Sequence, residues 1–108
     1  MRYVIDIDGT ICTQVDGDYT AAQPLTERIN LINKLYDEGH TIIFQTARGM
    51  GRYNNDAKKA IEKFYDFTEK QLASWNVQYH KLVLGKAAGD FYVDDKSLPI
   101  EQFFNKES

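Results

Sequence analysis

Short apolar runs rich in β-branched residues recur along the chain and predict the strands of a β-sheet. Four segments have this character: Tyr3–Ile5, Thr41–Phe44, Lys81–Leu84 and Phe91–Val93. They lack a clean alternation of apolar and polar positions, which favours strands that are buried on both faces, as in a parallel sheet. We therefore expect about four short parallel strands.

The stretches between the first three runs predict helices. One helix begins near Pro24 and ends at Gly39, and its apolar stripe consists of Leu25, Ile29, Ile32 and Leu35 or Tyr36. The second helix is longer, is capped by Asn54 or Asn55, and has a stripe formed by Ala57, Ile61, Phe64, Thr68, Leu72 and Trp75. A last short helix is expected from Pro99 to Phe104. Strands that alternate with helices predict right-handed parallel crossovers and an α/β fold.

The connection from Ile11 to Ala22 is too long for a simple turn between the first strand and the first helix. Its Asp16-Gly17 pair is a good signal for the tip of a small hairpin. A hairpin just past the carboxyl end of a strand is well placed to act as a flap over a site. An ordinary surface loop explains the same residues equally well.

Length and composition indicate a single globular domain that spans residues 1–108. The chain is 43% hydrophobic and 27% charged, and its net charge of −3 does not attract nucleic acid or an anionic membrane. Cys12 is the single cysteine, so no internal disulfide is expected. The sequence contains no recognisable membrane span or signal-peptide core. A cytoplasmic location is the expectation.

Polar residues follow the predicted strands at their carboxyl ends, where open α/β sheets bind ligands. The set comprises Asp6, Asp8, Gly9 and Thr10 after the first strand, Thr46 and Arg48 after the second, Lys86 after the third, and Asp94 and Asp95 after the fourth. Several carboxylates at one edge repel each other unless a cation shares them. Hard oxygen ligands suit Mg²⁺ best.

The order of these residues resembles the motifs of the haloacid dehalogenase (HAD) superfamily. Asp6-Ile7-Asp8-Gly9-Thr10 behind an apolar strand is similar to the first motif, and Thr46 to the hydroxyl residue of the second. Lys86 resembles the lysine of the third motif, and Asp94-Asp95 the acidic pair of the fourth. The resemblance covers nearly the whole chain. It implies a Rossmann-like (HAD-like) sheet with strand order 4-1-2-3, helices on both faces and no cap domain.

The resemblance also implies catalytic roles. Asp6 would be the nucleophile that forms an aspartyl-phosphate, and Asp8 would act as general acid and then as general base. Thr46 would donate a hydrogen bond to a phosphoryl oxygen. Lys86 would pair with the phosphate and with Asp6.

Metal and substrate contacts are implied at the same edge. Mg²⁺ would be held by Asp6, by the backbone carbonyl of Asp8 and by the fourth motif, in which Asp95 would bind directly and Asp94 would support it. Gly9, Thr10 and Arg48 are the expected substrate-binding residues. For Arg48 two interpretations stay open: it holds a second anionic group of the substrate, or it is an exposed loop arginine.

An aspartate at position 8 favours a phosphatase among the activities of this family, because hydrolysis of an unactivated phosphate ester needs a general acid. The segments Ile11–Ala22 and Gly49–Tyr79 leave no room for a cap. Open sites of this kind accept large substrates or are covered by oligomerisation. The chain resembles small HAD-like proteins of bacterial capsule and surface-polysaccharide biosynthesis, which makes a phosphorylated sugar the leading small-molecule substrate.

Two other classes compete with the enzyme. A signalling receiver domain also uses an acidic pair, a phosphorylated aspartate, a threonine and a lysine, but its acidic pair follows the first strand, whereas Asp94-Asp95 follows the last. A non-catalytic binding module on a HAD-like scaffold would be favoured by the loss of a motif residue. None of the motif residues is lost.

Overall fold

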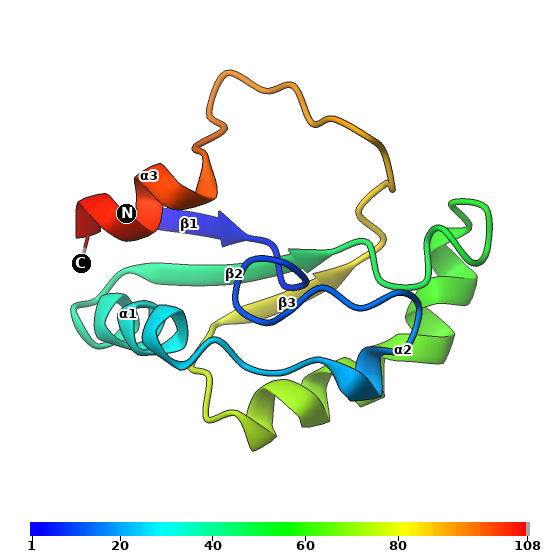
Figure 1. Cartoon of the computed structure of the whole chain (residues 1–108), viewed down its shortest axis with the longest axis horizontal. Helices are drawn as coiled ribbons and strands as arrows, with labels where there is room; N and C mark the ends of the chain where they lie inside the picture. Colours follow the sequence, from blue (N-terminus) through cyan, green and yellow to red (C-terminus); the bar gives the residue numbers. More distant parts are fainter. Residues whose placement is uncertain (108) are drawn as a thin grey trace.

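Three strands, three α-helices and one 3-10 helix are arranged in an alternating order (Figure 1). The structure is a computed structural model that describes residues 1–107, with side chains as far as residue 105. In chain order the elements are β1 (Arg2–Ile5), η1 (Tyr19–Ala21), α1 (Thr26–Asp37), β2 (Thr41–Thr46), α2 (Ala57–Ser74), β3 (Lys81–Leu84) and α3 (Ile100–Glu107). No helix within residues 1–107 is long and apolar enough to cross a membrane.

The sheet has the parallel α/β arrangement that the apolar runs predict. β2 lies between β1 and β3 and is parallel to both. In this register Ile5 pairs with Phe44, and Thr46 pairs with Leu84. The carboxyl ends of the three strands therefore meet at one edge, where Asp6 and Thr46 become neighbours although they are far apart in sequence.

The helices lie on one face of the sheet. Figure 1 shows α1 and α2 on the same side of the strands, and α3 packs beside α1. On the opposite face Val4 is 59% exposed. We expected helices on both faces, but two consecutive right-handed crossovers that move across the sheet in one direction place both of their helices on the same side.

The hydrophobic core fills the space between the sheet and this helical layer. Alternate strand residues point into it, namely Ile5, Ile42, Phe44, Leu82 and Leu84. The helices contribute Ile29, Ile32, Leu35, Phe64, Leu72, Phe103 and Phe104. The predicted apolar stripe of α1 becomes buried at Ile29, Ile32 and Leu35. In α2 the stripe is buried at Phe64, Thr68 and Leu72, but Ile61 is 41% exposed and Ala60 is buried beside it.

The segment Phe91–Val93 belongs to a loop in this structure and does not form the expected fourth strand. Phe91 is 88% exposed and Val93 is 97% exposed, and the chain between β3 and α3 arches away from the sheet (Figure 1). A parallel strand beside β1 requires the chain to recross the sheet, and such crossovers usually take a dozen or more residues. Residues 85–90 supply six. The strand order within residues 1–107 is β1-β2-β3, and the outer edge of β1 has no neighbouring strand.

The start of α2 differs from the prediction by one or two residues. Asp56 caps the helix, because its side chain accepts a hydrogen bond from the backbone N–H of Lys59 at 3.3 Å. Asn54 and Asn55 instead adopt left-handed backbone conformations, with φ of 53° and 62°. The side-chain oxygen of Asn55 accepts a hydrogen bond from the N–H of Ala88 at 2.9 Å, which ties the loop after β3 to the start of α2.

The connection between β1 and α1 is closed at its base like a hairpin but not along its length. The N–H of Thr13 donates to the carbonyl of Gln23, and the N–H of Leu25 donates to that of Ile11, both at 2.9 Å. Gly17 has a φ of 79° at the expected bend. After the bend, η1 takes the place of a second strand, so the connection is a folded loop.

We predict that Gly49→Ala destabilises the protein by about 2–4 kcal/mol, because a side chain there meets both backbone strain and overpacking. Gly49 has a φ of 80°, and an added Cβ would lie 2.6 Å from Cδ2 of Phe64. The control is Gly51→Ala, where an added Cβ has nothing within 4 Å. Urea denaturation of both variants measures the difference, and equal stabilities would contradict the close approach of α2 to this turn.

Candidate active site

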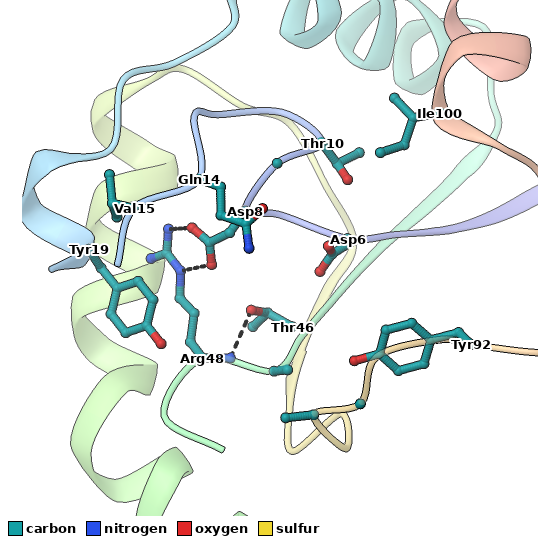
Figure 2. A pocket seen from close by; sticks show the side chains of 14 residues that line it. Asp6, Asp8, Thr10, Gln14, Val15, Tyr19, Thr46, Arg48, Tyr92 and Ile100 are labelled. Atoms are coloured by element: carbon teal, nitrogen blue, oxygen red, sulfur yellow. Dashed lines mark hydrogen bonds and ion pairs between the residues drawn. The ribbon is translucent and has the colours of Figure 1, made fainter. Parts of the chain in front are cut away.

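A cavity of about 440 Å³ opens at the carboxyl edge of the sheet (Figure 2). Six residues predicted from the sequence line it: Asp6, Asp8, Gly9, Thr10, Thr46 and Arg48. Lys86 is held at its rim by a 3.9 Å contact between its Nζ and Oδ1 of Asp6. The structure thus brings together every predicted catalytic residue from three different strand ends.

The turn after β1 shapes the floor of the cavity. The N–H groups of Thr10 and Ile11 both donate to the carbonyl of Ile7, at 3.0 and 2.9 Å, and the N–H of Gly9 donates to that of Cys12 at 2.9 Å. Gly9 has a φ of 81°, a conformation that glycine adopts without strain. The sequence Asp-Gly-Thr therefore folds into a tight turn that keeps Asp6 and Asp8 on the same rim.

Asp6 lies between Thr10 and Thr46 in Figure 2, which labels all three side chains. Its side chain is half-buried. Burial raises the pKa of Asp6, and the positive charge of Lys86 opposes that rise. A carboxylate in this position is partly stripped of water and pairs with the ammonium of Lys86, and a perturbed pKa in a cavity marks a candidate functional group.

Thr46 ends β2 and is almost completely buried. Its Oγ1 accepts a hydrogen bond from the backbone N–H of Arg48 at 3.1 Å, so the hydroxyl proton remains available for another acceptor. The carbonyl of Thr46 accepts from the N–H of Lys86 at 3.2 Å. This hydrogen bond places the backbone of Lys86 beside the end of β2.

Asp8 and Arg48 form a buried ion pair (Figure 2). Nε of Arg48 donates to Oδ2 of Asp8 and Nη2 donates to Oδ1, both at 2.9 Å. The side chain of Arg48 is 0% exposed and that of Asp8 is 18% exposed. Nη1 of Arg48 also donates to Oγ1 of Thr68 on α2 at 3.3 Å, and the guanidinium lies 4.8 Å from the centre of the Tyr19 ring. Arg48 is therefore not the exposed loop arginine of the second interpretation.

The loop after β3 carries Lys86 and a tyrosine into the site. Nζ of Lys86 lies 4.1 Å from the centre of the Tyr92 ring, close enough for a cation–π interaction. The hydroxyl of Tyr92 donates to the carbonyl of Ala87 at 2.6 Å. Lys86 is thus held between Asp6 and an aromatic face.

Asp94 and Asp95 are the predicted residues that the structure does not bring to the cavity. Both are exposed in the loop before α3. The backbone N–H of Lys96 donates to Oδ1 of Asp94 at 2.9 Å and lowers the pKa of Asp94. Within the described residues, no three acidic, histidine or cysteine side chains come together as metal ligands.

The donors at the cavity fit a Mg²⁺ ion in part. Asp6 offers one half-buried carboxylate beside the turn that contains Asp8. Mg²⁺ in enzymes is often held by one or two carboxylates, substrate phosphate and several waters. A second carboxylate would have to come from the Asp94–Asp95 segment, which lies in the exposed loop.

Sequence reasoning missed several residues that line the cavity. They are Gln14, Val15 and Tyr19 from the loop before α1, Ala47 after β2, and Ala88, Gly89, Tyr92 and Ile100 from the chain after β3. Tyr19 is the most connected of them. Its hydroxyl accepts from the N–H of Gly49 at 2.9 Å, and its carbonyl accepts from Nε2 of Gln71 at 2.8 Å. An aromatic residue in an otherwise polar loop was the available signal.

Comparisons with known proteins give partial matches. No protein-family model and no curated protein matches this chain. A solved structural-genomics target from Vibrio cholerae is 25% identical, with a TM-score of 0.83, and the match covers 99% of this chain and 98% of that one. A D,D-heptose 1,7-bisphosphate phosphatase from B. bronchiseptica, solved with magnesium and phosphate, is 14% identical, with a TM-score of 0.55.

The match to the heptose bisphosphate phosphatase covers 82% of this chain and 51% of that one, so this chain spans about half its length. At this identity the likeness shows the fold alone. The two likenesses and the parallel sheet support a HAD-like fold for this α/β protein. What its site does is a separate question, because fold alone does not determine activity.

Cys12 lies under the cavity and is predicted to be chemically inert. It is 0% exposed, and its Sγ donates to Oδ1 of Asp8 at 3.5 Å. Burial, followed by the negative charge of Asp8, raises its pKa to about 12. Since the thiolate is the reactive form, native protein at pH 8 should react with iodoacetamide at least about 100-fold more slowly than urea-unfolded protein. Mass spectrometry measures both rates, and equal rates would contradict the burial of this thiol.

Proposed function

We propose that this protein is a Mg²⁺-dependent phosphomonoester hydrolase that works through an aspartyl-phosphate on Asp6. The observation that carries the proposal is the position of the Asp6 carboxylate, which lies on a cavity 3.9 Å from the ammonium of Lys86, with Thr46 on the same cavity. A nucleophile, a cation and a hydroxyl donor are the groups that phosphoryl transfer requires around one phosphate.

The first step transfers the phosphoryl group to the protein. An oxygen of Asp6 forms a bond to phosphorus while the bond between phosphorus and the leaving oxygen breaks. Asp8 gives a proton to that leaving oxygen, so that the product leaves as a neutral alcohol. Lys86 pairs with the phosphoryl oxygens, and the free hydroxyl proton of Thr46 is donated to one of them.

The second step hydrolyses the aspartyl-phosphate and regenerates the carboxylate of Asp6. Water attacks the phosphorus, Asp8 takes a proton from that water, and the bond between phosphorus and Asp6 breaks to release inorganic phosphate. Arg48 uses one lone pair on each oxygen of Asp8. Each carboxylate oxygen has two lone pairs, and Oδ1 also accepts from Sγ of Cys12, so it is Oδ2 that keeps a lone pair for proton transfer.

The proposal assigns the metal to Asp6, the backbone carbonyl of Asp8 and the fourth motif, with Asp95 binding directly and Asp94 in support. When bound, Mg²⁺ neutralises negative charge on the phosphate. For Asp95 to take part, the loop between β3 and α3 must close toward β1, with Phe91–Val93 pairing along its outer edge as the fourth strand of a 4-1-2-3 order. The six residues 85–90 are a short connection for this crossing, but when fully extended they reach about 20 Å, and three spacings between strands amount to about 14 Å. The strong exposure of Phe91 and Val93 favours closure, because burying such a side chain stabilises by about 1.5–3 kcal/mol.

The proposed substrate is a small phosphorylated metabolite, with a sugar phosphate favoured. A cavity of about 440 Å³ accommodates a molecule of that size. The heptose bisphosphate phosphatase, which has a similar fold, is named for a phosphorylated sugar. A role in capsule or polysaccharide biosynthesis, a cytoplasmic location and a homo-oligomer that covers the open side of the cavity complete the proposal. Gly9 and Thr10 are proposed to contact the substrate.

We expect the purified protein to hydrolyse p-nitrophenyl phosphate only when Mg²⁺ is present, because the carboxylates around the phosphate repel it without a cation. EDTA should abolish activity, and added Mg²⁺ should restore it. Asp6→Asn should lower kcat by at least about 10³-fold with an unchanged circular dichroism spectrum, since it removes the nucleophile at nearly constant volume.

The matched control for this test is Asp16→Asn, which changes an exposed carboxylate in the loop before α1 and should keep full activity. Activity that survives complete chelation would overturn the metal assignment. An Asp6→Asn variant with a large share of wild-type kcat would overturn covalent catalysis. Stable phosphorylation of Asp6 by acetyl phosphate without turnover of esters would favour a phospho-accepting module.

Asp8→Asn should slow the first step far more with a poor leaving group than with a good one. A sugar alkoxide needs a proton in the transition state, whereas a nitrophenolate hardly does, and general acid catalysis is typically worth about 10²–10⁴-fold. Single-turnover release of the leaving group measures this step without interference from hydrolysis of the aspartyl-phosphate. Equal losses on both substrates would refute the acid role of Asp8.

The ion pair with Arg48 adds a necessary control to this experiment. Loss of the Asp8 charge leaves a buried guanidinium without its partner, which typically costs about 3–5 kcal/mol of stability. The rates therefore have to be compared well below the melting temperature of the variant. A uniform loss caused by partial unfolding would affect both substrates equally and would disappear on cooling.

A further inference from the structure

We infer that Arg48 is a positioning residue, which fixes the orientation of the Asp8 carboxylate and does not contact the substrate. The inference rests on the proposed function, because it assigns to Arg48 a role in the proton transfer that Asp8 performs. It departs from the interpretation that Arg48 holds a second anionic group of the substrate.

Three of the five N–H donors of the guanidinium bind side chains of the protein. Nε and Nη2 each donate to one oxygen of Asp8 at 2.9 Å, in the planar two-point geometry that arginine makes with carboxylates. Nη1 donates to Oγ1 of Thr68 at 3.3 Å, and Thr68 is itself 0% exposed. A two-point contact fixes both the position and the plane of the carboxylate, which a single hydrogen bond does not.

Aromatic rings separate the guanidinium from solvent. The centre of the Tyr19 ring lies 4.8 Å from the guanidinium carbon, and that of Phe67 lies 6.0 Å away. The side chain of Arg48 is 0% exposed, whereas that of Asp8 is 18% exposed. The carboxylate thus keeps some exposure, whereas the guanidinium has none, and Figure 2 shows the guanidinium directed at the carboxylate of Asp8.

Tyr19 connects this arrangement to the loop before α1. Its ring packs on Phe64 of α2, with ring centres 5.0 Å apart, and its hydroxyl accepts from the N–H of Gly49. The loop, the end of β2 and α2 therefore all hold the guanidinium in place. Because its supports come from three elements, Arg48 holds the Asp8 carboxylate in a fixed orientation.

The test uses Arg48→Lys, which keeps the positive charge but loses the two-point geometry. With an alkyl phosphate, the single-turnover rate of leaving-group release should fall about 30–100-fold, the size expected for a misplaced catalytic group. With p-nitrophenyl phosphate the rate should fall less than about 3-fold, because that leaving group hardly needs a proton. KM should change less than about 3-fold for both substrates.

The matched control is Arg52→Lys. Arg52 also binds the loop before α1, through a 2.7 Å hydrogen bond to the carbonyl of Gly17, and also packs on Phe64, but it is exposed and does not contact Asp8. It should leave both rates unchanged. If Arg48→Lys fails to fold, Thr68→Val replaces it, because it removes one support of the guanidinium and should give the same pattern with a smaller loss.

Three results would overturn the inference. An increase in KM that grows with a second anionic group on the substrate, at constant kcat, would show that Arg48 binds substrate. Equal rate losses with both leaving groups would show that Asp8 is not the group affected. A lower melting temperature with normal rates at low temperature would show a purely structural role.

Failure of the proposed function is distinguishable from failure of this inference. If the wild-type protein hydrolyses no phosphate ester, the function is wrong, and thermal denaturation then tests the pair without activity. Asp8→Asn, Arg48→Lys and the double variant form a cycle. Melting-temperature shifts that add up would contradict the coupling of the two side chains, and a double variant shifted clearly less than the sum would support it.

Discussion

The buried ion pair between Asp8 and Arg48 is the interaction on which the arrangement of the cavity depends. It joins the turn after β1 to the turn after β2, and through Thr68 and Tyr19 it extends to α2 and to the loop before α1. Buried ion pairs are weak evidence for stability, since desolvation offsets much of the attraction. Buried ion pairs nevertheless require a fixed geometry, because a buried charge that loses its partner lowers the stability of the protein.

The two sides of the cavity differ in how firmly they are held. On the side of Arg48, several elements converge and side chains are buried. On the side of Lys86, one loop runs from β3 to α3, carrying the exposed Phe91 and Val93. That loop is fastened near its start by Asn55 and by the carbonyl of Thr46. The side of Arg48 is therefore well fixed, whereas the loop that carries Lys86 has fewer contacts. Such an arrangement suits a reaction in which this loop closes on the ligand.

In the described part of the chain, the outer edge of β1 is unpaired, and the loop between β3 and α3 is the segment that could cover it. Edge strands expose backbone donors and acceptors and are usually covered or paired. In the proposed 4-1-2-3 order, the apolar segment Phe91–Val93, which lies in a loop in this structure, would pair with this edge. The same segment carries Asp94 and Asp95 at its end, so pairing of the edge and completion of a carboxylate cluster would be one event.

Local patterns were sufficient for the three strands, the long helices and the polar residues that line the cavity at the strand ends. Apolar runs and helical stripes predicted β1, β2, β3 and both long helices, and the positions of Asp6, Thr46 and Lys86 at strand ends placed them at one edge. The prediction worked because parallel strands share the edge at which they end. Residue preference did not separate Asp56 from the two preceding asparagines, because Asp and Asn are equally favoured at the N-cap. Asp56 is the residue that caps α2.

The sequence by itself determined the α/β alternation and the set of residues at the carboxyl edge, because burial periodicity and strand ends are local properties. Only the tertiary structure decided that both long helices share one face, that Phe91–Val93 lies in a loop, and that Arg48 turns inward to Asp8. The physical reason is the same in each case. Each outcome depends on how far a connection reaches, or on which distant residue pairs with a charge. Neighbouring residues in the sequence determine neither of these.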